Sequence, residues 1–223
     1  MPERSGTDFL DALTPDERRA LLQLGRRRRF RRGAVLFREG ERSDGVFLVL
    51  EGRVKVSYFT DAGREIVLSV RGPGDLLGEL STLDGEPRSA SGIAMGTVEA
   101  VLVPAEAFLA FLEAHPRVSL ALLRMLSRRL REATRRRIEY GAYDTLGRVA
   151  RRLVELAREG TLPAGTEIEI PLRLSQEELA GWVGASREAV SKALRVLRRR
   201  GWVATHRRGV VILDLEALRR RAL

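Results

Sequence analysis

The chain of 223 residues contains no cysteine, only two histidines, and just two lysines among its 40 basic residues. Without cysteine it forms no disulfides and no thiolate metal sites, and it has no cysteine nucleophile. The histidines, His115 and His206, lie too far apart in the sequence to suggest a metal cluster. No apolar run approaches the length of a membrane span, and no charged-then-apolar signal segment begins the chain. We therefore expect a cytoplasmic protein with no membrane association.

Positive charge is abundant and concentrated toward the C-terminus. Hydrophobic residues make up 44% of the chain, enough for packed cores, and the formal net charge is +10. The residues before Asp144 include 24 basic and 20 acidic side chains (+4), whereas the shorter remainder has 16 and 10 (+6). A basic module indicates nucleic acid, an anionic membrane or an acidic partner. The alternative is a bias toward arginine, which supplies 38 of the 40 basic residues, and composition does not separate the two.

The first half of the chain has the pattern of a small β-domain. Residues 14–24 predict a short helix, because Thr14, Pro15 and Glu17 form a capping box with proline at the first helical position. From 31 to 103, short apolar runs alternate with glycine-containing turns, including the hairpin turn TDAG at 60–63. Evenly spaced strands of this kind predict an antiparallel sandwich or barrel.

A long helix is predicted over 117–143, after a short helix that ends at Pro116. Its apolar residues gather on one broad side, and the helix is too long to bury that side on a small barrel. We expect its free part to pair with a second copy of itself in a homodimer. Asp144 is placed to cap the next helix, so Gly141 and Asp144 flank a candidate hinge. The residues of the apolar side are Leu122, Leu123, Met125, Leu126 and Leu130.

Two short helices near the C-terminus predict a helix-turn-helix. Ser175 and Glu178 form a capping box for the first helix, and Ser186 caps the second, at 187–200, which Gly201 ends. At 100° per residue, Val190, Ala193 and Leu197 share an inward face, with Glu188, Lys192, Arg195 and Arg199 opposite. A hairpin with its turn near Arg208–Gly209 follows, which makes the motif winged.

The outward face of the helix at 187–200 suits DNA. The second helix of such a motif enters the major groove N-terminus first, so its first side chains meet base edges. Arg187 can pair with guanine and Glu188 can accept from cytosine. An acid facing a polyanion is unfavourable without a specific contact, so Glu188 argues against a purely electrostatic surface. The alternative is a solvated basic helix in a winged fold that binds a protein. The candidate DNA-binding residues are Ser175, Gln176, Ser186, Arg187, Glu188, Ser191 and Lys192, of which Ser175, Gln176 and Ser186 lie at helix starts that suit phosphates.

A second constellation, GELSTLDGEPRSAS at 78–91, has the chemistry to bind a cyclic phosphodiester. Gly78 allows close backbone approach, Glu79 can accept from a ribose 2′-hydroxyl, and Arg88 can neutralise the phosphate while Ser89 donates to it. The alternative is a surface turn between strands, which the DG and the proline also fit.

The two constellations, in this order, resemble the catabolite activator (CRP/FNR) family of transcription regulators. GEL…PRSA is similar to its phosphate-binding cassette and VGASREAVSKAL to its recognition helix, and RVKV, GPGDLLGEL and DTLGRVA also fit. The resemblance implies an α+β protein with three parts: a cyclic-nucleotide-binding β-barrel (jelly roll) with flanking helices at 1–116, a dimerisation helix and hinge at 117–143, and a winged helix-turn-helix at 144–223. It implies cAMP or a related nucleotide as allosteric effector, bound by Gly78, Glu79, Leu80, Arg88, Ser89 and Thr134.

The resemblance also implies partners and a mechanism. They are a two-fold symmetric double-stranded DNA site, a second copy of the chain, and RNA polymerase, which an activating patch at 160–167 would contact. Ligand contacts on the long helix would change the pose of the DNA-binding domains. The expected function is a nucleotide-controlled transcription regulator; the alternative keeps the fold with a different effector or with ligand-independent DNA binding. We expect no enzyme, because the sequence presents neither a nucleophile–base pair nor a metal set.

Two departures from the family pattern bear on the effector and on base reading. Where cAMP-responsive members place a threonine followed by a small polar residue against the adenine, this chain has Ala133 and then Thr134. Ala133 offers no side-chain hydrogen bond, which weakens binding by about 0.5–1.5 kcal/mol. Lys192 stands where the best-known member has arginine, and lysine lacks the planar fork.

Overall fold

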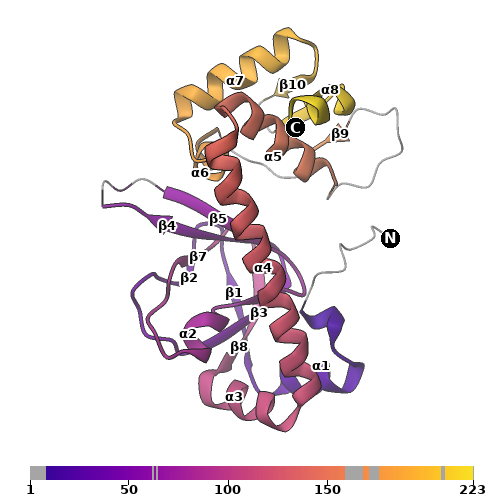
Figure 1. Ribbon diagram of the computed structural model, residues 1–223. Coiled ribbons are helices and arrows are strands. Elements are labelled where there is room, and N and C mark those ends of the chain that lie inside the picture. Colours follow the sequence, from indigo (N-terminus) through magenta and orange to yellow (C-terminus); the bar gives the residue numbers. More distant parts are fainter. Residues whose placement is uncertain are drawn as a thin grey trace. The chain divides into compact units, whose positions relative to one another are not determined.

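The computed structural model describes residues 9–61, 63, 65–158, 168–170, 176–206 and 209–222. The chain divides into two compact units, and the division falls within one long helix, between Arg131 and Glu132. We call them the barrel unit and the C-terminal unit and describe each separately (Figure 1). Among the described residues, no helix is long and apolar enough to cross a membrane.

The barrel unit contains two four-stranded antiparallel sheets, as the alternation of apolar runs and turns predicts. β3 has an almost continuous apolar sequence because both of its faces are buried. Phe47 and Val49 belong to the core between the two sheets, whereas Val46 and Leu48 pack toward the helices outside. The first sheet has the order β1 (Arg26–Phe30), β8 (Val98–Pro104), β3 (Gly45–Glu51) and β6 (Leu76–Leu77); the second has β2 (Val35–Phe37), β7 (Ser91–Ala94), β4 (Val54–Phe59) and β5 (Glu65–Arg71).

Helices cover the outer face of the first sheet. They are the 3-10 turn η1 (Leu10–Ala12), α1 (Pro15–Gln23), α3 (Ala105–Ala114) and the first part of α4 (Pro116–Ala142). The predicted capping box is present: the Thr14 side chain accepts from the Glu17 amide, and the Glu17 carboxylate accepts from the Thr14 amide. Arg117 at the start of α4 donates to both Glu17 carboxylate oxygens, at 3.0 and 2.7 Å, and so joins α4 to α1.

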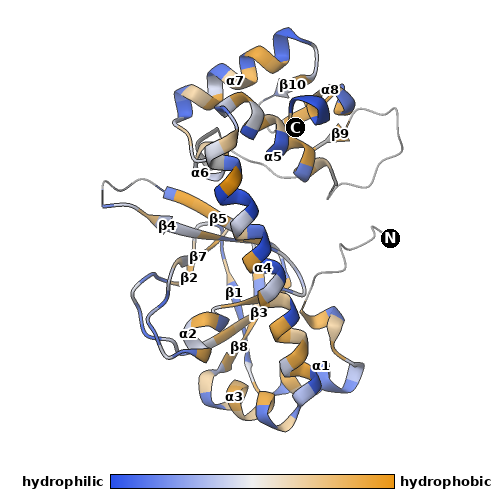
Figure 2. Cartoon of the chain, viewed as in Figure 1, coloured by the Kyte–Doolittle hydropathy of each residue, from blue (hydrophilic) through white to orange (hydrophobic). Residues whose placement is uncertain are grey.

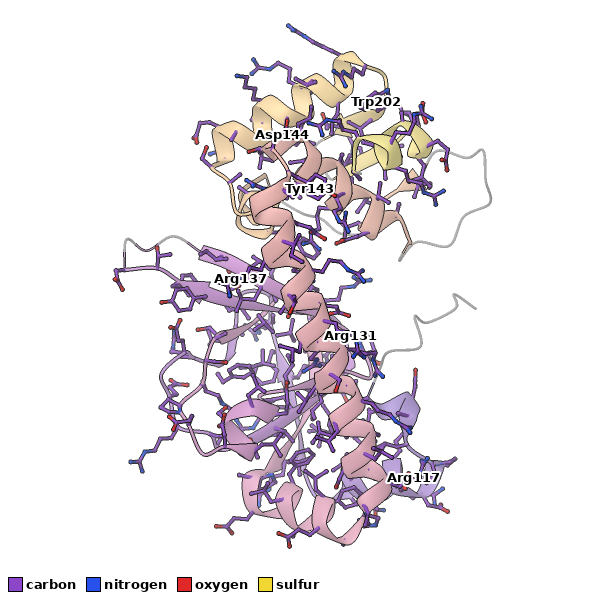
Figure 3. The ribbon with its side chains drawn as sticks, viewed as in Figure 1. Arg117, Arg131, Arg137, Tyr143, Asp144 and Trp202 are labelled. Atoms are coloured by element: carbon purple, nitrogen blue, oxygen red, sulfur yellow. The ribbon has the colours of Figure 1, made fainter. Side chains whose placement is uncertain are left out.

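The apolar side of α4 divides between burial and exposure. Val118, Leu122 and Met125 are buried against the barrel, whereas Leu123 and Leu130 are 60% and 69% exposed. Figure 3 marks the course of this helix by Arg117, Arg131 and Arg137, with Tyr143 and Asp144 at its end. The predicted apolar side of the helix therefore consists of two adjacent rows of residues. One row packs into the barrel core and the other is exposed.

Two elements of the barrel unit were not predicted from the sequence. β1, with the sequence RRRRF, was not predicted, because four exposed arginines carry no apolar alternation. The run GELSTL lies in the region where strands and turns were expected, and within it α2 (Glu79–Leu83) is a short helix. Gly78 adopts φ 78° and ψ 13°, which turns the chain out of β6, and the Thr82 hydroxyl donates back to the Gly78 carbonyl at 3.1 Å. This left-handed backbone is the reason for the break.

The C-terminal unit is a winged helix-turn-helix. Its described elements are α5 (Thr145–Arg158), β9 (Ile168–Glu169), α6 (Gln176–Val183), α7 (Arg187–Arg199), β10 (Val203–His206), β11 (Gly209–Ile212) and α8 (Leu215–Arg221). β10, β11 and β9 form an antiparallel sheet, so the predicted wing is present. α8 was not predicted from the sequence; Asp214 caps it by accepting from the Ala217 amide at 2.8 Å.

Asp144 caps α5 as predicted, by accepting from the Gly147 amide at 2.8 Å. It also binds Arg221 of α8 through both carboxylate oxygens, at 2.5 and 2.6 Å. The hydrogen bond from the Gly147 amide is the main cause that lowers the pKa of Asp144, and Arg221 lowers it further. Nearby, Glu139 pairs with Arg151 at 2.8 Å. The hinge expected between Gly141 and Asp144 stays a prediction. The contacts of Asp144 and Glu139 connect this segment to α5 and α8.

Candidate functional sites

The first candidate site begins at Gly78, where β6 gives way to α2. A Cβ atom at this position would lie 2.3 Å from the Nη1 atom of Arg88, and the φ of 78° is one that other residues rarely adopt. Gly78 is therefore required twice, for its backbone conformation and for the close approach of the arginine.

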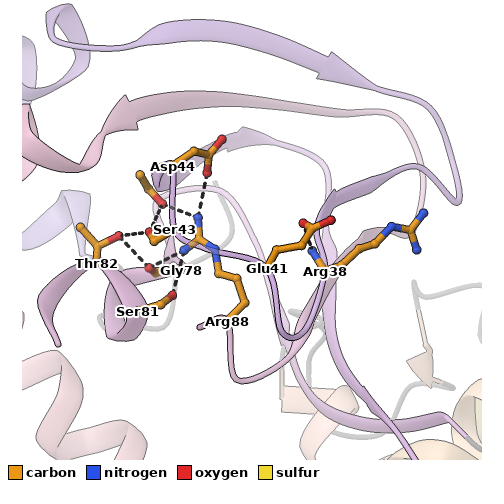
Figure 4. Close-up of polar contacts among 9 residues, drawn as sticks. Arg38, Glu41, Ser43, Asp44, Gly78, Ser81, Thr82 and Arg88 are labelled. Atoms are coloured by element: carbon orange, nitrogen blue, oxygen red, sulfur yellow. Dashed lines mark hydrogen bonds and ion pairs between the residues drawn. The ribbon is translucent and has the colours of Figure 1, made fainter. Parts of the chain in front are cut away.

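Arg88 lies under this turn with 2% of its surface exposed (Figure 4). Its Nη1 donates to the Gly78 carbonyl at 2.7 Å and to the Ser81 hydroxyl at 3.1 Å. Its Nη2 donates to the Gly45 carbonyl at 2.6 Å and to the Asp44 carboxylate at 3.0 Å. The Phe37 ring stacks on the guanidinium, with the ring centroid 4.8 Å away. Burial lowers the pKa of Arg88 from its ordinary value, and the charge of Asp44 partly offsets this.

One donor of Arg88 remains available. Its Nε–H is buried and has no hydrogen-bond partner among the described residues. A buried unpaired donor on a cation costs free energy, and an anionic acceptor would satisfy it. The residues around Gly78 therefore fit a phosphate, which would bind at a charged, unsatisfied N–H.

Glu79 is buried and paired with a residue that the sequence did not reveal. Its carboxylate accepts from Arg129 Nη1 at 2.6 Å, and Arg129 also donates to the Leu76 carbonyl at 2.8 Å and lies 3.6 Å from Asp75. Arg129 follows Glu79 by 50 residues, so no local motif joins them. The available signal was its position on the barrel-facing side of α4, four residues after Met125.

The remaining predicted ligand residues are more accessible. Leu80 is 48% exposed and Ser89 is exposed. Thr134 is exposed on the part of α4 that belongs to the C-terminal unit. The structure thus brings Gly78, Glu79 and Arg88 into one cluster and adds Ser81 to it.

The second candidate site is formed by α6, a tight turn and α7. Gly184 has φ 62° in the turn, and the Ala185 amide donates to the Ala180 carbonyl at 3.0 Å. Ser186 caps α7 by accepting from the Ala189 amide at 3.2 Å. The predicted inward face is confirmed: Val190, Ala193, Leu194 and Leu197 are buried. In Figure 2 the ribbon of α7 alternates between hydrophobic and hydrophilic colours.

The outer face of α7 is exposed and mainly cationic. Arg187, Glu188 and Lys192 are exposed at its first turns, Ser191 is half-buried, and Arg195 and Arg199 continue the face. Hydrogen bonds from its own backbone amide and from the Ser186 hydroxyl lower the pKa of Glu188. The carboxylate thus interacts with the first turn of its own helix while it remains exposed.

Ser175 and Gln176 are two further residues that were predicted to contact DNA. Ser175 lies outside the described residues, and Gln176 is described only as the first residue of α6. At the other end of α7, Arg198 donates to Thr205 of β10 at 2.9 Å, which fixes the wing to this helix.

Comparison with known proteins matches a domain family to each unit of the chain. Residues 27–115 match the family model of the cyclic nucleotide-binding domain, and residues 147–221 match that of the Crp-like helix-turn-helix domain. The chain is 39% identical over 193 residues to the CRP-like cAMP-activated global transcriptional regulator of Mycobacterium tuberculosis, covering 86% of each chain. It is 33% identical to the cyclic AMP receptor protein of Thermus thermophilus, covering 89% of this chain and 88% of that one.

Among solved structures, the c-di-GMP responsive global regulator CLP of Xanthomonas campestris superposes with a TM-score of 0.80 at 27% identity, covering 89% of this chain and 99% of that one. These relatives are transcription regulators rather than enzymes. The barrel with its phosphate-compatible arginine, the winged helix-turn-helix and these similarities lead to one conclusion: the chain is a DNA-binding member of the catabolite activator (CRP/FNR) family of transcription regulators with a cyclic nucleotide-binding domain.

Proposed function

We propose that two copies of this chain form a transcription regulator whose binding to a two-fold symmetric DNA site is controlled by cAMP or a similar cyclic nucleotide. RNA polymerase is the partner through which the bound dimer would act. The observation that carries the nucleotide assignment is Arg88, a buried cation whose Nε–H has no acceptor among the described residues.

The ligand would be held by the residues of the Gly78 cluster. Its phosphate would accept hydrogen bonds from the Nε–H of Arg88 and from the exposed Ser89 hydroxyl. Its ribose 2′-hydroxyl would donate to Glu79, which Arg129 holds in place. Gly78 and Leu80 line the turn, and Thr134 would contact the base. These roles are consistent with the chemistry of each side chain.

Dimerisation is supported by the exposed apolar face of α4. Leu120, Leu123, Leu130 and Ile138 are 46%, 60%, 69% and 63% exposed. At 100° per residue, they fall within an arc of about 80° along the helix. Thr134 lies within the same arc, which places it on the face that a second copy would cover. Exposed apolar side chains aligned along a long helix are typical of a helix-pairing surface.

A different effector is the second candidate, and a specific residue favours it. Ala133 has no side-chain donor or acceptor where cAMP-responsive members have threonine, and a relative of the same fold is described as responsive to c-di-GMP. Losing one hydrogen bond reduces affinity several-fold without abolishing the phosphate site. We therefore retain cAMP as the first probe and c-di-GMP as the comparison.

In the DNA complex, α7 would enter the major groove by its N-terminus. Arg187 and Glu188 would read guanine and cytosine, with Ser191 and Lys192 alongside, and Ser175, Gln176 and Ser186 would contact phosphates. The half-site is then expected to contain G and C where Arg187 and Glu188 bind.

The test is a DNA-binding assay at fixed salt, with and without cAMP, cGMP and c-di-GMP, together with calorimetric titration of each nucleotide. Arg88→Ala should abolish the nucleotide response, whereas Arg38→Ala, which removes an exposed arginine of the same unit, should keep it. A response that survives in Arg88→Ala contradicts the ligand site. DNA binding that no nucleotide changes supports ligand-independent control.

The oligomeric state has a separate test. Leu123→Glu should convert the dimer to a monomer in light scattering, because it places a charge in the proposed helix pair. Leu24→Glu adds the same charge at a leucine that is 41% exposed outside α4, and should leave the dimer intact. A dimer that persists in Leu123→Glu contradicts pairing through this face.

A further inference from the structure

Asp44 is the one carboxylate that hydrogen-bonds to Arg88 among the described residues. It directly precedes β3, and its Oδ1 accepts from Arg88 Nη2 at 3.0 Å (Figure 4). The two side chains differ sharply in environment, since Arg88 is 1% exposed and Asp44 is 58% exposed. Glu79 and Glu41 also act on Arg88, but only through charge. Asp44 thus faces solvent on one side and the buried guanidinium on the other.

The donors of Arg88 can be accounted for one by one. A guanidinium has five N–H groups. Two acceptors, Gly78 and Ser81, lie against Nη1, and two, Gly45 and Asp44, lie against Nη2. Only the Nε–H is left. A ligand oxygen that accepts from it therefore binds a guanidinium whose other N–H groups already face protein acceptors.

A phosphate binds arginine best through two parallel N–H groups. Nε and Nη2 form one edge of the guanidinium, so a two-point contact that uses the vacant Nε also needs Nη2. Of the two acceptors at Nη2, the Gly45 carbonyl is fixed, because Gly45 pairs with Pro104 in the sheet. The Asp44 side chain is exposed and can turn into solvent. The phosphate would therefore displace the Asp44 carboxylate from Nη2 rather than the Gly45 carbonyl.

We propose that Asp44 is a built-in competitor for the ligand phosphate and sets the affinity of the site for anions. In the absence of ligand, its carboxylate compensates the buried charge of Arg88. When the ligand binds, its phosphate replaces the Asp44 carboxylate as the anionic partner of Arg88. Repulsion between the phosphate and the Asp44 carboxylate then lowers the affinity. The inference rests on the proposed function, because it concerns the same phosphate site.

Asp44→Asn tests the charge while keeping an oxygen acceptor for Arg88. In calorimetric titration at low salt, the variant should bind cAMP about three- to tenfold more tightly than the parent protein, as expected for removing one nearby like charge in a partly solvated site. The gain should shrink at high salt, because Asp44 is exposed and screened. Glu86→Gln removes an exposed carboxylate from the loop before Arg88 and should leave the affinity unchanged.

Equal or weaker cAMP binding by Asp44→Asn overturns the inference; weaker binding would mean that Asp44 positions Arg88 instead. A second arm requires no nucleotide recognition: thermal stabilisation of each protein by inorganic phosphate. Greater stabilisation of Asp44→Asn supports the competition, and equal stabilisation, including none in either protein, overturns it. Failure of the parent protein to bind any cyclic nucleotide would instead contradict the proposed function, whatever the phosphate arm shows.

Discussion

The pair between Glu79 and Arg129 offers a quantitative test of the barrel unit. The Glu79 and Arg129 side chains are 7% and 16% exposed, and their charged groups are 2.6 Å apart. Breaking a buried pair by removing one partner typically costs 3–5 kcal/mol, because the other charge stays buried alone. Since the pair is not fully buried, we expect the low end of this range: Arg129→Met should lower the free energy of unfolding of this unit by about 3 kcal/mol.

The reverse substitution should cost less. In Glu79→Gln, Arg129 keeps the Leu76 carbonyl at 2.8 Å and Asp75 at 3.6 Å, so we expect a loss of about 1 kcal/mol. The double variant leaves no uncompensated charge at either position, and its cost should be about 2 kcal/mol rather than the sum of about 4. The coupling energy between the two positions is then about 2 kcal/mol.

The measurement is urea unfolding at fixed protein concentration, followed by circular dichroism. Both tryptophans, Trp182 and Trp202, belong to the C-terminal unit, so their fluorescence reports that unit and serves as an internal control. Its transition should not move in any of the three variants. A coupling energy below about 0.5 kcal/mol would refute the reasoning, because distant independent sites already add within that margin.

Three further predictions concern single positions. Gly78→Ala should lower cyclic nucleotide affinity in calorimetry while the protein stays folded, because its Cβ would lie 2.3 Å from Arg88; unchanged affinity would contradict the role of this turn. Glu188→Ala should relax preference at one base pair by about 1–3 kcal/mol in competition binding, whereas a uniform loss across sequences would mean that this carboxylate reads no base. Hydrogen bonds from Arg117 and from the Thr14 amide lower the pKa of Glu17 to about 2 from an ordinary 4.5, so the stabilisation from these contacts is complete above pH 4.5 and lost as the pH falls through 2. Acid titration of Glu17→Gln should lack this component, and an acid transition identical to that of the parent protein would exclude it.

The sequence predicted those elements whose signals are local. The capping box at Thr14, the Asp144 cap and the Ser186 cap each join residues three positions apart, and all three are present. The inward face of α7 followed from helical periodicity alone. These features depend on chain geometry over one or two turns, which a sequence displays directly.

The features that the sequence did not reveal depend on contacts between distant residues or on backbone conformation. The exposed strand β1 is defined by its pairing with β8 rather than by its own composition. The helix α2 depends on the left-handed Gly78. Arg129 contacts Glu79, and Asp44 contacts Arg88, across 50 and 44 residues of sequence. Arginine is so common in this chain that composition gives no reason to single out Arg129.

The charged side chains of the proposed ligand site are paired within the protein, and this has a consequence for the proposed signalling. Arg88 is compensated by Asp44, and Glu79 by Arg129. A cyclic nucleotide would change both pairs at once, because its phosphate approaches Arg88 while its ribose hydroxyl donates to Glu79. The second change matters beyond the barrel, since Arg129 belongs to α4 and lies five residues before Thr134 on that helix. Weakening the hold of Glu79 on Arg129 alters the attachment of α4 to the barrel, and α4 also carries the exposed apolar face proposed for dimerisation. If the ligand binds as proposed, the Glu79–Arg129 pair is the contact through which it would act on α4, and the coupling energy of this pair would limit how strongly binding at this point can bias that helix.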